Sequence, residues 1–124
     1  LPSLENAVQL YQGRYFEGSM VQEWLTVEEQ YYHQQFLIAA ERLTNQLFEK
    51  GELEKALQTT YQLLTQDQSC ESAYTMQMRI FHAMGQIAMI RTTYKQCQRH
   101  FRKTFGTEVS PIVTAIYEEL VNAE

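Results

Sequence analysis

Two glycines bound the stretch that decides the fold of this chain, residues 51–85, which reads GELEKALQTTYQLLTQDQSCESAYTMQMRIFHAMG. Gly51 and Gly85 lie 34 residues apart (85 minus 51), and each separates two segments whose apolar residues recur at helical spacing. A glycine just past the last apolar position is typical of a helix end, because it adopts a left-handed backbone without a Cβ clash. The stretch therefore predicts a helix, a tight turn and a second helix, repeated with a fixed period.

Helical periodicity continues from this stretch toward both ends of the chain, and strand-like alternation is nearly absent. A short first helix is expected after the candidate cap Ser3 and before Gly13, followed by a loop over residues 14–19. A long second helix is expected to end at Lys50. The other expected helices cover residues 52–65, 70–84 and 86–105 and a last segment from Pro111 onward.

Three patterns mark expected helix starts. Thr26 and Glu29 have the spacing of a capping box, although the residues just before them can already be helical. Ser69 is a candidate cap for the fourth helix. Ser110 precedes Pro111, and proline suits the first position of a helix because it has no N–H to leave unpaired.

Each expected helix has one apolar face, and these faces define the expected core. The inward positions are Leu25, Tyr32, Phe36, Ala39, Ala40, Leu43, Leu47, Leu53, Ala56, Leu57, Thr60, Leu63, Leu64, Ala73, Tyr74, Gln77, Ile80, Phe81, Met84, Ile87, Ile90, Tyr94, Cys97, Phe101, Phe105, Val113, Ile116, Tyr117 and Leu120.

A repeated unit of helix, tight turn and helix with this period is typical of tetratricopeptide arrays, whose units stack into a curved scaffold that binds other macromolecules. We therefore expect an all-α, tetratricopeptide-like antiparallel solenoid of about six helices, with two central repeats and a capping helix at each end. Ala56 fits the small residue of the tetratricopeptide pattern. Ile90 stands at the same place in the second repeat and predicts a wider helix crossing, and Gln68 replaces the usual proline.

Size and composition indicate one folded domain over residues 1–124, because 44% of the residues are hydrophobic and 12% are aromatic. No apolar run approaches the roughly 20 residues of a membrane span, and no signal peptide is apparent. Two cysteines, Cys70 and Cys97, are too few for a disulfide framework, which favours reduced thiols in a cytoplasmic protein. The chain does not begin with Met, so we expect it to be a piece excised from a longer protein.

The charge is unevenly distributed around a formal net value of −5. Half of the ten basic residues lie between positions 91 and 103, and none of the 15 acidic residues lies among them. Arg91, Lys95, Arg99 and either Arg102 or Lys103 are spaced three or four residues apart, so they fall along one helix face. The candidate partner-binding residues are Arg91, Lys95, Arg99, Arg102 and Lys103.

Two interpretations of this basic face stay open. It can be a docking surface for an acidic partner, for phosphate or for the acidic flank of a second copy, or it can be a solvated helix face. Arg99, Arg102 and Lys103 also lie near the end of their helix, where the macrodipole favours positive charge. The net negative charge of the chain argues against nucleic-acid binding by the whole module.

Catalytic and metal-binding patterns are incomplete. Cys97 and His100 lie one helical turn apart, but a nucleophile and base need an orienting group, and a metal needs further ligands. A buried thiol that fills space explains Cys97 equally well. Trp24 is either a core residue, which burial tendencies favour, or an exposed anchor for a partner. We expect no catalytic residue, no metal site and no cofactor, and therefore no enzyme.

A narrower resemblance lies mainly in the flanks of the repeats. The matching positions, in order, are residues 10–13 (LYQG), Glu23, Trp24, Asp67, Glu71, Ala73, residues 105–111 (FGTEVSP), Tyr117 and Leu120. Over nearly its whole length the chain resembles the bacterial transcriptional activator domain. This tetratricopeptide-like module occurs beside a winged-helix DNA-binding domain in regulators of the Streptomyces antibiotic regulatory protein type. Gln68 and Val109 depart from the resemblance, because the family usually has prolines there.

The resemblance implies a role in transcription regulation, with DNA bound by a winged-helix domain that this sequence lacks. The module itself would contact a protein partner: a second copy, the transcription machinery or another domain of the parent protein. No nucleic acid or membrane partner is expected. The alternative is a general tetratricopeptide adaptor that binds a peptide or partner protein in its groove. The first helices of the two pairs carry few basic residues (Arg42 and Arg79), which counts mildly against that alternative.

Overall fold

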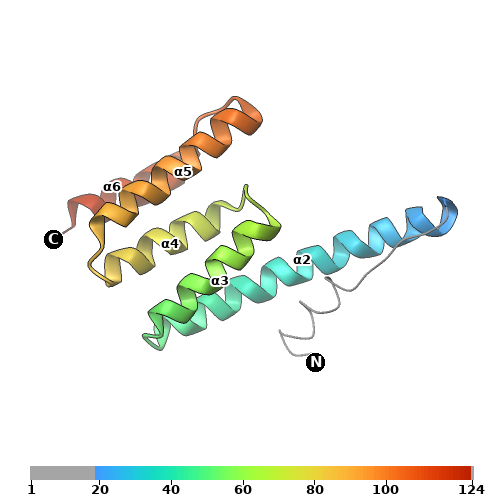
Figure 1. Ribbon diagram of the computed structural model, residues 1–124, viewed down its shortest axis with the longest axis horizontal. Helices are drawn as coiled ribbons and strands as arrows, with labels where there is room; N and C mark the ends of the chain where they lie inside the picture. The colour runs from blue at the N-terminus through green and yellow to red at the C-terminus, as the bar shows by residue number, and fades with distance from the viewer. Residues whose placement is uncertain (1–18, 124) are drawn as a thin grey trace.

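The computed structural model describes residues 19–123, with side chains from residue 26 onward, and every described secondary-structure element is a helix. The five helices, labelled as in Figure 1, are α2 (Ser19–Glu49), α3 (Leu53–Gln66), α4 (Glu71–Ala83), α5 (Ile87–Phe105) and α6 (Pro111–Asn122). The all-α class is therefore confirmed for this part of the chain. The helix expected between Ser3 and Gly13 lies outside the described residues, as does the loop expected at residues 14–18.

The start of α2 corrects the sequence prediction. The helix begins at Ser19, so Ser19 does not belong to a loop, and Thr26 lies inside the helix instead of capping it. Residues 19–25 contain neither Gly nor Pro, and the helical backbone therefore continues through them without a break. The spacing of Thr26 and Glu29 was not sufficient to fix a helix start.

The turns after α2 and α4 have the same geometry. Gly51 and Gly85 both have left-handed backbones, with φ of 80° and 76°. In each turn the glycine amide donates to the carbonyl three residues back at 3.0 Å. The next amide donates to the carbonyl five residues back, at 2.9 Å for Glu52 and 2.8 Å for Gln86. These are the bonds of the Schellman motif, so both glycines end helices as the sequence predicts.

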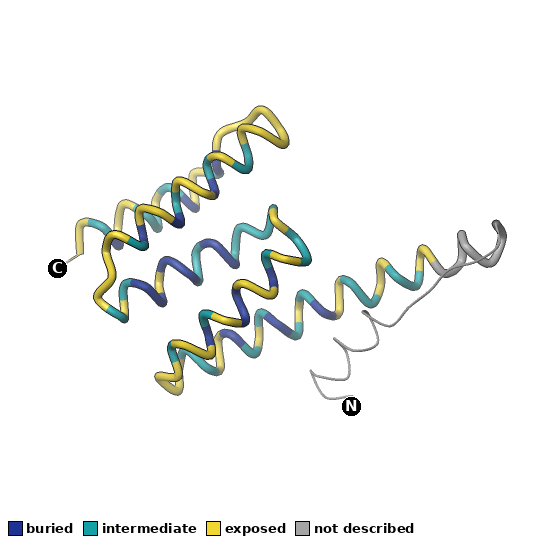
Figure 2. Tube along the Cα trace, viewed as in Figure 1, coloured by how far each residue is buried: buried dark blue, intermediate teal, exposed yellow. Residues whose placement is uncertain are grey.

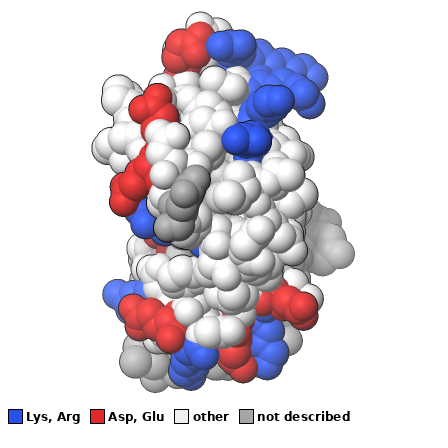
Figure 3. All heavy atoms as spheres, turned by 90° about the vertical axis from the view of Figure 1, so that its left-hand side faces the viewer, with Lys and Arg blue, Asp and Glu red and all other residues white. Residues whose placement is uncertain are grey.

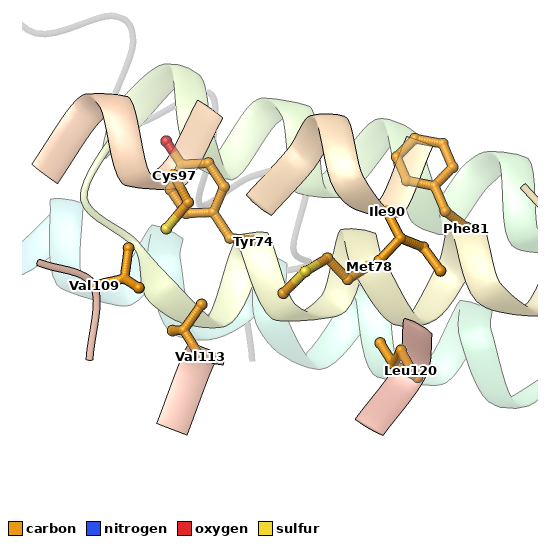
Figure 4. Close-up of a cluster of buried hydrophobic side chains, with 8 residues drawn as sticks. All are labelled: Tyr74, Met78, Phe81, Ile90, Cys97, Val109, Val113 and Leu120. Carbon is orange, nitrogen blue, oxygen red and sulfur yellow. The ribbon is translucent and has the colours of Figure 1, made fainter. Parts of the chain in front are cut away.

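Each helix packs against the next one along the chain, and α4 also contacts α2 and α6. The buried positions lie on the faces that the helices turn toward one another (Figure 2). One core cluster joins α4, α5, the following loop and α6, as Figure 4 shows, and consists of Tyr74, Met78, Phe81, Ile90, Cys97, Val109, Val113 and Leu120. A second cluster joins α2, α3 and α4 through Phe36, Ala40, Leu63 and Ala73. Because α4 contributes to both clusters, it holds the two halves together.

The predicted inward positions are buried or half-buried, with two exceptions among the described side chains. Ile87 and Phe105 are 39% and 54% exposed, so their inward assignment is wrong. They lie at the two ends of α5. This helix has 19 residues and is longer than α4 or α6, so these two helices do not cover its ends. Met78, by contrast, is fully buried although the pattern did not include it.

The core also contains polar side chains that the apolar pattern did not include. Thr44, Thr59 and Thr93 are buried, and Thr44 meets Thr59 through their hydroxyl groups where α2 packs on α3. The two hydroxyls also lie 2.7 Å from the carbonyls of Ala40 and Ala56, one turn back on their own helices. Threonine can therefore be buried here, because its hydroxyl finds a partner without leaving the helix.

The predicted helix start at Ser110 and Pro111 is confirmed, and the predicted cap at Ser69 is wrong. Ser110 precedes Pro111, and its hydroxyl accepts the Val113 amide at 3.4 Å. At the start of α4 the N-cap is Cys70, without a side-chain capping bond. The Ser69 amide instead donates to Asp67 Oδ1 at 3.0 Å, so the aspartate organises the turn.

Candidate interaction site

The five basic residues singled out in the sequence all lie exposed on α5. The structure brings four of them together around one open surface depression, which Gln98 also lines. We call these four residues the basic patch: Lys95, Arg99, Arg102 and Lys103. Arg91 lies one turn before Lys95, outside the depression. In Figure 3, Lys and Arg atoms gather in the upper part of the drawn face, with an acidic group beside them.

One carboxylate of the chain approaches this patch. Glu108, in the loop between α5 and α6, accepts from Arg102 Nε at 3.3 Å and from Arg102 Nη2 at 3.2 Å. Gly106 makes this approach possible, because its φ of 66° reverses the chain after α5, and the buried Val109 anchors the loop against the core. Both charged side chains are well exposed, at 61% and 70%, so the ion pair contributes only about 0–1 kcal/mol to stability.

The other three cations of the patch have no such partner among the side chains from residue 26 to residue 123. Among the residues that the structure describes, no carboxylate lies within ion-pair distance of Lys95, Arg99 or Lys103. Of these three, Lys103 lies in the last turn of α5, where the macrodipole partly offsets its repulsion from the other cations. As far as the described side chains extend, the patch is therefore a single-sign surface in which Arg102 alone is paired with a carboxylate.

An aromatic cluster lies at the same end of α5. The Phe105 ring packs against Phe101 with a centroid distance of 5.5 Å, and the His100 ring meets both edge-on at 5.6 and 6.1 Å. Phe105 is exposed and stands three residues after Arg102, so the two side chains leave the helix at neighbouring positions. The apolar periodicity predicted a core role for Phe105 and thereby missed this surface aromatic.

Cys97 and His100 do not form a nucleophile and base. Cys97 is fully buried, and burial, with a smaller contribution from Glu71, raises its thiol pKa to about 12. His100 Nε2 lies 3.0 Å from Ser69 Oγ, and its Nδ1 lies 3.4 Å from Thr104 Oγ1, so both ring nitrogens contact other side chains. The thiolate that catalysis requires is thus disfavoured at neutral pH.

Three further features weighed in the sequence are a metal site, the side chain of Trp24 and a membrane span. No group of three or more metal-binding side chains comes together within the described part of the chain. Trp24 lies on α2, but its side chain is outside the described set, so its assignment to the core or to the surface stays a prediction. None of the described helices combines the length and the apolar character needed to cross a bilayer.

The described residues thus form an all-helical domain whose most distinctive surface feature is a cationic patch beside an exposed aromatic ring. A family model, the bacterial transcriptional activator domain, matches residues 1–121. The chain therefore belongs to the bacterial transcriptional activator domain family, as the sequence resemblance indicated. No curated protein and no solved structure gives a significant match to it.

Proposed function

We propose that the chain is a protein-interaction and oligomerisation module of a bacterial transcription regulator, with DNA contacted by a winged-helix domain of the parent protein. The family match over residues 1–121 supports the role in transcription activation. The observation that carries the interaction role is the basic patch, in which three of four cations lack a carboxylate partner among the described residues. An exposed cluster of one sign favours encounter with a surface of the opposite sign.

We further propose that residues 1–124 act as one cytoplasmic unit built like a tetratricopeptide array. In this arrangement α2 with α3 and α4 with α5 form the two repeats, and α6 covers the end of the stack. The identical turns at Gly51 and Gly85 support the repeat. The contact of α4 with α2 supports the stacking, because it links the first helices of the two pairs, and the contact of α4 with α6 supports the covering role of α6.

The first experiment measures DNA binding by this chain. Charge favours a protein partner: phosphate contacts need many cations, and the chain has a net charge of −5. We expect fluorescence anisotropy with labelled duplex DNA to show no tight binding at physiological salt. Tight, strongly salt-dependent binding would contradict the assignment of DNA contact to another domain.

The second experiment measures self-association by sedimentation. If the basic face meets an acidic flank of a second copy, the triple change Arg91→Glu, Lys95→Glu and Arg99→Glu should weaken the dimer. The matched control alters three exposed basic residues elsewhere to Glu, namely Arg42, Lys50 and Arg79, with the same change in net charge. A monomeric wild type would contradict self-association through this face. Equal effects of the two triple variants on the dimer would contradict it as well.

A further inference from the structure

Glu108 shows which ligand chemistry the basic patch accepts. Its two carboxylate oxygens face two nitrogens of Arg102, at 3.2 and 3.3 Å, in the paired geometry that guanidinium groups form with carboxylates. The pair is exposed and joined through a loop, so an external carboxylate can compete for the same nitrogens. Within this chain, then, the patch already binds a side-chain carboxylate.

The position of the patch favours an extended acidic segment over a compact phosphate. One common kind of phosphate site uses the N-terminus of a helix, where amides point at the anion. Three of the four cations lie instead in the last two turns of α5, so the patch consists of side chains and offers no helix N-terminus to a phosphate. The depression is open, and its charges come from four separate side chains distributed along the helix. Several carboxylates spaced along a peptide match such a surface better than one concentrated charge.

Phe105 adds an apolar contact next to the charges. Its ring is 54% exposed, although it packs on Phe101 and lies close to His100. Covering this ring would remove apolar surface from water beside Arg102, and partner contacts commonly centre on such aromatic anchors. A segment that combines carboxylates with a large apolar side chain would use both features together.

We propose that the basic patch and Phe105 bind an acidic segment of a protein partner in which a large apolar side chain stands beside the carboxylates. Glu108 occupies part of this site in the free domain and is displaced when the segment binds. This inference rests on the proposed function, because it takes the partner to be a protein. To that function it adds the chemistry of the bound segment. It also adds Glu108 as an intramolecular competitor for the same site.

The test uses the full chain and a fluorescein-labelled probe peptide made of Asp and Glu residues around one Phe, with binding followed by anisotropy. We expect binding that weakens as salt is raised, because exposed charges are screened. The double change Lys95→Glu and Arg99→Glu should weaken it by about tenfold or more. Circular dichroism of each variant verifies that the helices are retained.

The competitor role has its own matched pair of variants. Glu108→Gln removes the carboxylate that occupies Arg102 and should tighten probe binding about two- to fivefold, the range of an exposed ion pair. Glu118→Gln makes the same charge change at an exposed position of α6 and should leave the affinity nearly unchanged. In an Arg102→Gln background the gain from Glu108→Gln should disappear. Equal affinities of the two Glu→Gln variants would overturn the competitor role.

The apolar contact is tested with a second probe in which Phe is replaced by Ala. The wild-type chain should prefer the Phe probe by about three- to tenfold, from partial burial of one ring. Phe105→Ala should remove this preference, whereas Tyr61→Ala, at an exposed aromatic on α3, should keep it. Unchanged discrimination by Phe105→Ala would overturn the role of Phe105.

Failure of this inference and failure of the proposed function give different results. If the acidic probes do not bind but the chain self-associates through α5, the inference is overturned and the proposed function stands. If inorganic pyrophosphate binds at the patch and the peptides do not, the patch is a phosphate site and the inference is overturned. Tight DNA binding by the chain, without peptide binding or self-association, would overturn both.

Discussion

The Ser72 hydroxyl donates a hydrogen bond of 2.6 Å to Glu41 Oε1 and thereby links α4 to α2, two helices that are not consecutive along the chain. The Cys70 thiol lies 3.8 Å from the same oxygen, and burial raises the pKa of that thiol. All three side chains are half-buried, so their bonds are partly shielded from water. This polar contact supplements the apolar packing of Phe36 and Ala40 against Ala73 between the same helices.

Removing the Ser72 hydroxyl should therefore destabilise the domain. We expect Ser72→Ala to lower the free energy of unfolding by about 1–2 kcal/mol, because a half-buried carboxylate loses a donor. Urea denaturation measures the change, with Thr92→Ala, at an exposed and purely local hydroxyl, as the control. Glu41→Gln combined with Ser72→Ala should cost less than the two single changes together. Strict additivity would contradict direct coupling of the two side chains.

The turn at Gly85 should tolerate Asn better than Ala. With φ at 76°, Gly85→Ala should lower the free energy of unfolding by about 1–2 kcal/mol. An added Cβ would meet no atom within 4 Å, so this cost comes from the backbone alone. Gly85→Asn should cost less, because Asn enters the left-handed region more readily. Thermal melts of the two variants make the comparison, and a smaller loss for Ala would exclude backbone strain as the cause.

Gln77 is a buried polar side chain that should be replaceable by an apolar one. It is 1% exposed on α4, and its Nε2 has no hydrogen-bond acceptor among the described residues. Because an unpaired buried donor costs about 1–3 kcal/mol, Gln77→Leu should raise the free energy of unfolding. Gln62→Leu, at an exposed position of α3, is the control and should change little. A loss of stability in Gln77→Leu would mean that the amide makes a contact worth more than its desolvation.

Alkaline pH should unfold the domain through Cys97 and Tyr74. Burial raises the pKa of the Cys97 thiol from 9.0 to about 12 and is the main cause that raises the pKa of Tyr74 from 10.0 to about 12. The folded state therefore holds these protons more tightly than the unfolded state does. Their stabilising contribution is complete below pH 9, decreases as pH rises from about 9 toward 12, and is lost above that range.

Denaturant titrations at a series of alkaline pH values measure this dependence. Cys97→Ala should reduce the slope of the free energy of unfolding against pH between about pH 9 and 10. In this range the Cys97 thiol ionises in the unfolded state while it stays protonated in the folded state. The variant will also be less stable at neutral pH, since Cys97 is fully buried, so the slope is the informative quantity. A slope equal to that of the wild type would show that Cys97 does not contribute.

The sequence alone was sufficient where a structural feature depends on a few neighbouring residues. Gly51 and Gly85 ended helices as expected, because the left-handed turn needs only the absence of a Cβ and two backbone bonds. Ser110 and Pro111 began α6 for equally local reasons. The basic face of α5 also followed from spacing, since the helical repeat fixes which side chains share a face.

Tertiary packing decided the features that join distant residues. Helical periodicity placed Ile87 and Phe105 inward, but α5 is longer than the helices beside it, and its ends stay exposed. Ser69 was predicted to be a helix cap, yet its hydroxyl lies against His100, 31 positions further along the chain. Such contacts depend on how helices lie against each other, and local propensity carries no information about that placement.

The candidate site shows the same division. The sequence determined that the described part of this chain is helical, that its turn is repeated and that one face of α5 is basic, because all three arise from short-range backbone geometry. Only the tertiary structure decided that Glu108 returns to Arg102 and that Phe105 stands exposed beside it. The physical reason is the loop after Gly106, whose path is fixed by the burial of Val109 between α5 and α6 and not by any spacing within α5.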